Sequence, residues 1–173
     1  MCQFTNKIKM PTFNKIEWRS RRAVYTLGLI LAVMTGSYCL ATRLVFTQTA
    51  SLHHRLFYID KSGSPRVKGD TVVFEHNDQM TEGKTLLLTK IMACDEGDDL
   101  RVDTNKYYSC NGVPLGKARD KSSKNKPMKN FIWNGVIPPG YFLPLGEHER
   151  SYDGRYYGFK TKAQIKMKVI PIF

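Results

Sequence analysis

The sequence predicts a mainly β domain behind a single N-terminal transmembrane helix. Three observations carry this prediction. An apolar segment without a charged residue spans residues 23–42. After it, short runs of strand-forming residues alternate with turn residues such as glycine, proline and aspartate. No apolar pattern with a 3.6-residue period is sustained beyond residue 42, so we expect no further helix in the chain.

Residues 23–42 read AVYTLGLILAVMTGSYCLAT and form the expected membrane anchor. At about 1.5 Å per residue, a helix of this length crosses a hydrocarbon core about 30 Å thick. A cleaved signal peptide is the alternative. However, the apolar run exceeds the roughly 7 to 15 residues of such a signal, and no A-x-A cleavage site follows. We therefore expect an uncleaved anchor.

The charges that flank the anchor predict its orientation. Residues 1–22 form a basic segment, whereas Arg43 alone follows the apolar run closely. The cations before the anchor are Lys7, Lys9, Lys15, Arg19, Arg21 and Arg22. Because cytoplasmic flanks are enriched in Lys and Arg, we expect a cytoplasmic N-terminus and an extracytoplasmic domain over residues 43–173.

The exported part contains the predicted strands. Each expected strand is a short run of β-branched, aromatic or leucine residues that follows a turn signal or alternates apolar with charged residues. These runs are residues 71–74, 85–92, 100–102, 140–143 and 165–170. The polar stretch at about 115–130 is the expected insertion between strands.

The 115–130 stretch is also the second basic region of a chain with a net charge of +12. Its cations are Lys117, Arg119, Lys121, Lys124, Lys126 and Lys129. The stretch is either a solvated loop or a contact surface for anionic lipid headgroups or an acidic partner. Nucleic-acid binding is not expected, because no recognition motif accompanies the charge.

Two of the four cysteines lie in the exported part. Cys94 and Cys110 are 16 residues apart, and an oxidising compartment would let them pair. Closing a loop of that size stabilises a domain by about 3 kcal/mol in the chain-entropy model. A structural zinc site is not expected, because no second C-x-x-C or histidine pair lies nearby.

Lys90 is the most unusual residue of the exported part. It follows Leu86-Leu87-Leu88-Thr89 and precedes Ile91-Met92-Ala93, so its surroundings are expected to be at least partly apolar. Burial disfavours the charged ammonium and lowers the pKa of a lysine, which can then act as a general base. The alternative is a strand lysine whose flexible stem carries the ammonium to water.

Four stretches, in order, resemble the conserved boxes of the type I signal peptidases, which are serine/lysine membrane peptidases. Residues 146–159, GEHERSYDGRYYGF, resemble the G-D-x-x-x-x-S-x-D-S-R-Y-x-G box. Residues 89–98, TKIMACDEGD, resemble the lysine box, Cys110-Asn111-Gly112 resembles the N-G turn, and residues 136–142, VIPPGYF, resemble V-P-x-G-Y-F. Four ordered boxes are far more specific than a single motif.

Within that superfamily, the chain looks most like the conjugative-transfer TraF-type peptidases, which mature pilin subunits. The cysteine in the lysine box, the single anchor and the small size carry this resemblance. Residues 49–58, TASLHHRLFY, fit the T-x-S-x-P-x-G-x-Y/F stretch that holds the nucleophile of that branch, with Lys68-Gly69-Asp70 following. The chain departs from the pattern at His53 and Arg55, where the branch has a proline and a glycine.

The resemblance implies a role for each matching residue. Ser51 would be the nucleophile, and Lys90 its general base. Ser151 would orient the lysine amine, and Asp153 and Arg155 would brace the box. The Ser51 backbone N–H, and the Thr49 hydroxyl with it, would hold the oxyanion. Without the box, Ser151 would be a turn serine, and Asp153 and Arg155 an ordinary ion pair.

Two other sets of residues offer competing nucleophiles or bases. Ser64 stands before a proline, but it precedes Gly69 by too few residues to fit the boxes, and we interpret residues 62–65 as a turn. A Ser-His-Asp triad could use one of four histidines, yet none lies in a nucleophile-elbow context. These histidines are His53, His54, His76 and His148.

The resemblance implies a single-pass protein of the bacterial inner membrane with its catalytic domain in the periplasm. It would process a pilin or other membrane-inserted precursor, by hydrolysis or by transpeptidation that yields a cyclic product, without a metal or organic cofactor. The lipid bilayer and other proteins of the transfer apparatus would be its further partners. Two alternatives remain: a general leader peptidase, and a catalytically silent assembly component of the transfer apparatus.

Overall fold

The computed structural model describes residues 14–48, 51–81, 83–122 and 125–173. The chain divides into two units, residues 1–43 and residues 44–173. The first unit contains the helix α1 (Asn14–Ala41), and the second contains all eleven described strands. The mainly β fold class predicted from the sequence is confirmed.

Helix α1 has the composition of a membrane span. Its segment Arg21–Ala41 is long and apolar enough to cross a bilayer, and the side chains of this segment are exposed. Two threonine hydroxyls within it donate hydrogen bonds to carbonyls one turn earlier, Thr26 to Arg22 and Thr35 to Leu31. Such internal bonds satisfy hydroxyl groups where lipid offers no partner.

The larger sheet has seven strands in the order β1-β2-β11-β3-β4-β9-β10. Every pairing in it is antiparallel. Its strands are β1 (Leu44–Phe46), β2 (Leu56–Asp60), β3 (Thr71–His76), β4 (Leu86–Cys94), β9 (Tyr141–Leu145), β10 (Lys160–Thr161) and β11 (Ile165–Pro171).

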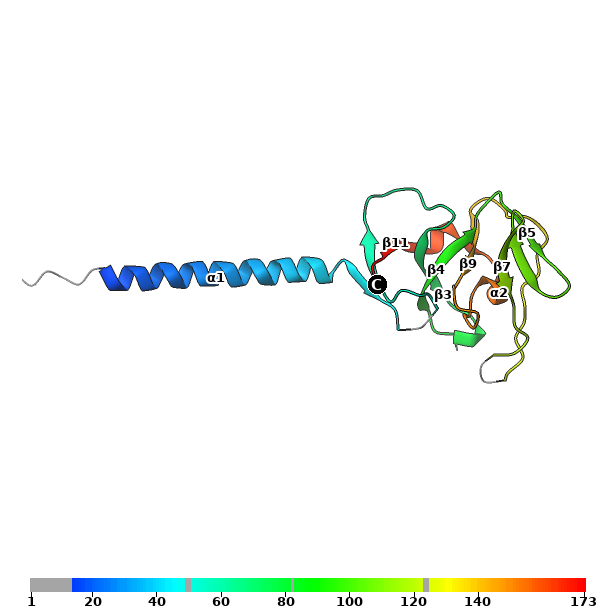
Figure 1. Ribbon diagram of the computed structural model, residues 1–173, viewed down its shortest axis with the longest axis horizontal. Helices are drawn as coiled ribbons and strands as arrows, with labels where there is room; N and C mark the ends of the chain where they lie inside the picture. Colours follow the sequence, from blue (N-terminus) through cyan, green and yellow to red (C-terminus); the bar gives the residue numbers. More distant parts are fainter. Residues whose placement is uncertain (1–13, 49–50, 82, 123–124) are drawn as a thin grey trace, which may run out of the picture. The chain divides into compact units, whose positions relative to one another are not determined.

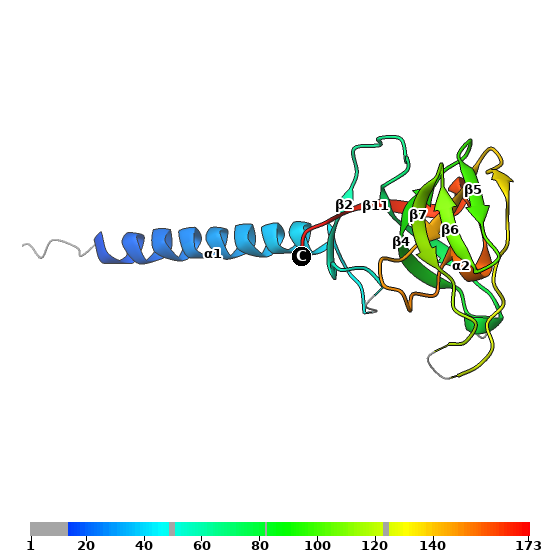
Figure 2. The same cartoon turned by 45° about the vertical axis from the view of Figure 1, so that its right-hand side comes forward.

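The second sheet has four strands in the order β7-β6-β5-β8. These are β5 (Asp99–Val102), β6 (Tyr107–Cys110), β7 (Val113–Lys117) and β8 (Gly135–Val136). In Figures 1 and 2, β4, β7 and β5 follow one another across the domain, so the second sheet lies beside the β4 side of the larger one. The disulfide between Cys94 of β4 and Cys110 of β6 joins the two sheets covalently, with the Cα atoms 5.8 Å apart.

Apolar side chains cover both faces of the larger sheet. Consecutive strand residues point to opposite faces. Val72 and Phe74 of β3 belong to one buried cluster, whereas Val73 belongs to another that includes Leu52 and Phe57. A third cluster fills the space between the two sheets and includes Leu100, Tyr108, Ile137 and Leu143. Strand β3 is therefore packed on both of its faces.

The five strands expected from the sequence are present as β3, β4, β5, β9 and β11. Six short strands were not predicted, because most are only a few residues long and depend on partners distant in the chain. These are β1, β2, β6, β7, β8 and β10.

The expectation of no further helix was wrong at α2 (Gly154–Tyr157). Asp153 begins this single turn by accepting a hydrogen bond from the Arg155 N–H. Short 3₁₀ turns, η1 (Gln79–Thr81) and η2 (Lys162–Gln164), complete the domain.

Candidate active site

Lys90 lies in the middle of β4 with only 2% of its surface exposed. It pairs with Val72 of β3, and cross-strand neighbours share a face, so its stem lies over the buried cluster that holds Val72 and Met92. Burial lowers the pKa of the Lys90 amine to about 8; the nearby Asp153 carboxylate raises this pKa and the Arg155 guanidinium lowers it. Lys90 is therefore buried, as its apolar neighbours in the sequence suggested.

Ser151 is the hydrogen-bond partner of Lys90. The Lys90 Nζ donates to the Ser151 Oγ over 2.5 Å, and Ser151 is buried as well. The sheet register explains the meeting: Leu145, the last residue of β9, pairs with Ile91, so the segment that leaves β9 passes beside Lys90. A turn closed by the Ser151 N–H and the His148 carbonyl then brings Ser151 to the amine.

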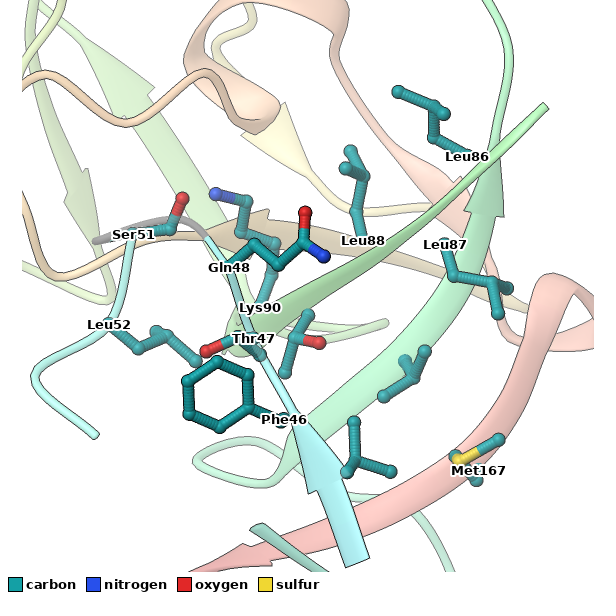
Figure 3. Close-up of a pocket in the computed structure, with 13 residues that line it drawn as sticks. Phe46, Thr47, Gln48, Ser51, Leu52, Leu86, Leu87, Leu88, Lys90 and Met167 are labelled. Atoms are coloured by element: carbon teal, nitrogen blue, oxygen red, sulfur yellow. The ribbon is translucent and has the colours of Figure 1, made fainter. Parts of the chain in front are cut away.

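Ser51 reaches the same place from the connection between β1 and β2. Ser51 and Lys90 line one groove, and Figure 3 shows the Ser51 hydroxyl and the Lys90 amine pointing toward each other at one end of it. Ser51 is half-buried. Its carbonyl accepts a hydrogen bond of 3.2 Å from the His148 N–H. The main chain at Ser51 is therefore tied to the same post-β9 segment that carries Ser151.

Asp153 and Arg155 form a buried bidentate pair beneath this segment. The Arg155 Nε donates to Asp153 Oδ1 over 2.9 Å, and Nη2 donates to Oδ2 over 2.7 Å. The Asp153 carboxylate also accepts from the Gly146 N–H, and the Arg155 Nη1 donates to the Lys117 carbonyl at the end of β7. The pair thus links both ends of the segment 146–155 to the second sheet.

Gly146 and Glu147 also position the site, although no role was predicted for them. A Cβ atom on Gly146 would lie 2.1 Å from the Ser151 Oγ and 2.8 Å from the Ser51 carbonyl oxygen, so no larger residue fits without displacing one of them. The Glu147 carboxylate accepts a 2.6 Å hydrogen bond from the His53 N–H. Both residues begin the 146–159 box, and their position in that motif could have indicated a role in the site.

Two of the competing candidates, Ser64 and His76, have other hydrogen-bond partners, and some expected residues are not described. Thr49 lies outside the described residues, as do Lys124 and most of the basic segment 1–22. The Ser64 hydroxyl is exposed and donates to Asp60 within a turn, in line with the interpretation of residues 62–65. His76 is buried at the end of β3, bonded to Asp78.

Cys94, Asp98 and Cys110 form a group of metal-ligand residue types, with ligand atoms within 4.8 Å of one another. The two sulfurs are bonded to each other, and the Lys68 ammonium lies 3.1 Å from both the Asp98 carboxylate and the Cys110 Sγ. A disulfide that is faced by a cation does not suit a divalent metal. The group therefore serves as a covalent and electrostatic link between the sheets.

The groove that holds Ser51 and Lys90 has a volume of about 450 Å³. One wall is the end of β1 and the residues after it, Phe46–Gln48, and the other is the first half of β4. Strand β9 pairs with β4 from Ile91 onward, so on that side the Leu86–Thr89 edge has no partner strand among the described residues. Phe46, Leu86 and Leu87 are exposed along it (Figure 3). An extended apolar peptide fits such an edge through main-chain hydrogen bonds.

The chemistry open to this arrangement follows from the lysine. A serine hydroxyl needs a neighbouring base to become a strong nucleophile, and an amine with a pKa of about 8 is partly neutral near pH 7.5. With a hydroxyl and a neutral amine at the end of a peptide-sized groove, the site can support acyl transfer without a histidine.

The comparison with curated protein sequences finds no match. Among solved structures, the chain is similar to the crystal structure of a signal peptidase I from Enterococcus faecalis, with 20% sequence identity and a TM-score of 0.41. That similarity covers 62% of this chain and 98% of the other. The model of the signal peptidase family, peptidase S26, matches residues 17–173, so the chain belongs to this family of serine proteases.

Proposed function

We propose that the chain is a membrane-anchored serine endopeptidase in which Ser51 is the nucleophile and Lys90 is the general base. The observation that carries the proposal is the buried Lys90 amine at one end of the groove, bonded to Ser151 and facing Ser51. Membership of the signal peptidase family and the apolar helix support a membrane-anchored peptidase.

The proposed reaction begins when the neutral Lys90 amine takes the proton from the Ser51 hydroxyl. The Ser51 Oγ attacks the scissile carbonyl of a peptide bound along the Leu86–Thr89 edge, and the Ser51 N–H stabilises the oxyanion, together with the Thr49 hydroxyl. The Lys90 ammonium then protonates the leaving amine, which departs and leaves an acyl-enzyme. Ser151 holds the amine toward Ser51 throughout.

The acyl-enzyme has two fates that begin from the same residues. Water releases a shortened chain by hydrolysis, whereas the amine of a peptide gives transpeptidation and, within one chain, a cyclic product. Each fate restores the Ser51 hydroxyl.

The substrate we propose is a pilin or other exported precursor of a conjugative transfer system. The resemblance to the TraF-type branch supports it through the lysine box, which contains Cys94. In this proposal the N-terminus is cytoplasmic and residues 43–173 are periplasmic. Ser51 follows the anchor closely in the sequence, and we expect a membrane-inserted precursor to emerge from the bilayer near it. The partners are the precursor, the bilayer and other proteins of the transfer apparatus.

A direct test follows the size of the pilin precursor in cells that carry Ser51→Ala or Lys90→Ala. Both should accumulate unprocessed precursor, while the matched serine variant Ser64→Ala should process it normally. Normal maturation in Ser51→Ala would contradict the nucleophile assignment and favour a catalytically silent assembly component. Mass spectrometry of the mature pilin separates the two fates, because cyclisation removes one water and leaves no free termini.

A general leader peptidase is the second candidate, favoured by the family assignment itself. The purified chain would then cleave secretory precursors unrelated to conjugation as fast as the pilin precursor. Cleavage restricted to the pilin precursor would exclude this candidate.

A further inference from the structure

Tyr152 stands between two residues of the site, Ser151 and Asp153, and its side chain is anchored elsewhere. The Tyr152 hydroxyl donates a 2.5 Å hydrogen bond to the Asp78 Oδ2, across 74 residues of sequence. Ser151 therefore has neighbours fixed at two different places: Asp153 bonds to Arg155, and Tyr152 bonds to the turn that follows β3.

Asp78 is itself held rigidly. Its Oδ1 accepts from the Thr81 N–H over 2.9 Å, and its own N–H donates to the Thr81 hydroxyl. Its Oδ2 also lies 2.8 Å from the Nε2 of His76, the last residue of β3, which is buried. The Tyr152 hydroxyl thus meets an acceptor that is anchored to the central sheet.

Aromatic packing holds the Tyr152 ring in place. It stacks on the Tyr156 ring with centroids 5.7 Å apart and meets the Tyr157 ring edge-on at 5.3 Å. The His76 ring packs against Tyr157 at 4.3 Å. These contacts leave the Tyr152 side chain little freedom to move, so its position fixes the backbone of the preceding residue.

We propose that Tyr152 is a positioning residue for the Ser51–Lys90 pair: its bond to Asp78 holds Ser151 where the Ser151 Oγ accepts the hydrogen bond from Lys90. The proposal rests on the assignment of Ser51 and Lys90 above. The box that the chain resembles leaves this position unspecified, so the bond is a property of this chain's own residues. Without the Tyr152–Asp78 bond, Ser151 would be held only through its neighbour Asp153 and through its own turn to His148.

Loss of the Tyr152 hydroxyl should change the behaviour of the Lys90 amine in two ways. Ser151 would spend less time in the bonded geometry, which slows proton transfer. Looser packing would also admit water, which weakens the desolvation that lowers the Lys90 pKa. The charged groups that act on Lys90 from neighbouring elements, Asp153 and Arg155, stay in place. Burial lowers the pKa of His76 on β3, and the hydrogen bond to Asp78 opposes this shift.

The test uses the full chain in detergent and a p-nitrophenyl ester, which acylates the serine without a pilin precursor. Tyr152→Phe should lower kcat about tenfold, as expected for the loss of one partly buried hydrogen bond, with KM within about twofold. The rising limb of its pH-rate profile should move to higher pH. Tyr156→Phe is the matched control: it removes a hydroxyl from the neighbouring ring, bonded to the Arg119 N–H, and should keep the wild-type kcat and limb.

A double-mutant cycle separates positioning from general loosening. In a Ser151→Ala background, Tyr152→Phe should cause no further loss of kcat, because Tyr152 acts through Ser151. A full additional loss, or a Tyr152→Phe enzyme with wild-type kcat and pH limb, would overturn the proposal. Asp78→Asn provides a second variant if Tyr152→Phe fails to fold.

A readout without catalysis distinguishes failure of this proposal from failure of the proposed function. The pH dependence of Lys90 labelling by an amine-reactive reagent, measured by mass spectrometry, gives the pKa of the amine directly. Tyr152→Phe should raise it toward the ordinary value of a lysine and Tyr156→Phe should not. Ester hydrolysis that survives Ser51→Ala would contradict the dyad, while this labelling would still decide the role of Tyr152.

Discussion

The Lys90 Nζ lies 2.5 Å from the Ser151 Oγ although 61 residues separate them in the sequence. The contact joins the middle of β4 to the segment after β9, and the same segment holds the Ser51 carbonyl through the His148 N–H. One short stretch of chain therefore sets the position of all three groups.

Activity should rise with pH as the Lys90 ammonium loses its proton. Burial lowers the pKa of Lys90 to about 8, and the proposed base is the neutral amine. The rate at pH 6 should thus be about a hundredfold below the plateau reached above pH 9. A pH-rate profile of ester hydrolysis measures this. Lys90→Arg should be inactive throughout, because arginine keeps its proton; a limb centred near the ordinary pKa of lysine would contradict the burial argument.

Lys90→Met should stabilise the β domain while abolishing activity. The pKa of Lys90 is lower in the folded than in the unfolded chain, so between about pH 8 and 10.5 the unfolded state binds more protons. Wild-type stability should accordingly rise with pH across that window and be reduced below it. At pH 7, removing the buried amine should raise the free energy of unfolding by roughly 1 to 3 kcal/mol.

Thermal melts of the two chains at pH 7 and pH 10 measure this effect. Lys166→Met is the control, because Lys166 is exposed on β11 and pairs with the exposed Glu75. It should change the melting temperature little. A Lys90→Met chain less stable than wild type at pH 7 would show that the amine is not desolvated.

Gly146→Ala should abolish most activity beyond any loss of folding. The added methyl group would lie 2.1 Å from the Ser151 Oγ and 2.8 Å from the Ser51 carbonyl oxygen, so both serines must shift. We expect a fall in kcat of at least about 100-fold, since small misplacements of reacting groups are costly.

Gly154→Ala is the matched comparison for that experiment. Its methyl group would also be crowded, 2.7 Å from the Pro144 carbonyl oxygen, but by neither serine. Its folded fraction should retain activity. Equal kcat values in the two variants, each corrected for the folded fraction by circular dichroism, would show that Gly146 has no special relation to the site.

Removal of the disulfide should loosen the link between the sheets. A double change of Cys94 and Cys110 to alanine should lower the free energy of unfolding by about 3 kcal/mol, the value expected for a loop of this length. Chemical denaturation with and without reductant measures it. Cys39→Ser, in the apolar helix, should leave the denaturation midpoint of the β domain unchanged. Thiol labelling of the denatured wild type should modify Cys94 and Cys110 only after reduction.

Much of the fold follows from local patterns. The apolar run of residues 23–42 corresponds to most of α1, and the five expected strands are present within a few residues of their predicted ends. Strands such as β1, β8 and β10 could not be predicted, because two or three residues carry too little periodicity and are held by partners far away in sequence. The helix α2 was missed because a single capped turn has no helical period.

By itself, the sequence determined the kinds of residue available for chemistry: a lysine among apolar neighbours, a serine soon after the anchor, and a box rich in glycine and charged residues. The tertiary structure decided which of them meet. The register of β9 against β4 brings Ser151 to Lys90, and Asp78 reaches Tyr152 across 74 residues. The absence of a side chain at Gly146 leaves room for the Ser151 hydroxyl and the Ser51 carbonyl. Such contacts depend on how distant strands pair and pack, which no local pattern specifies.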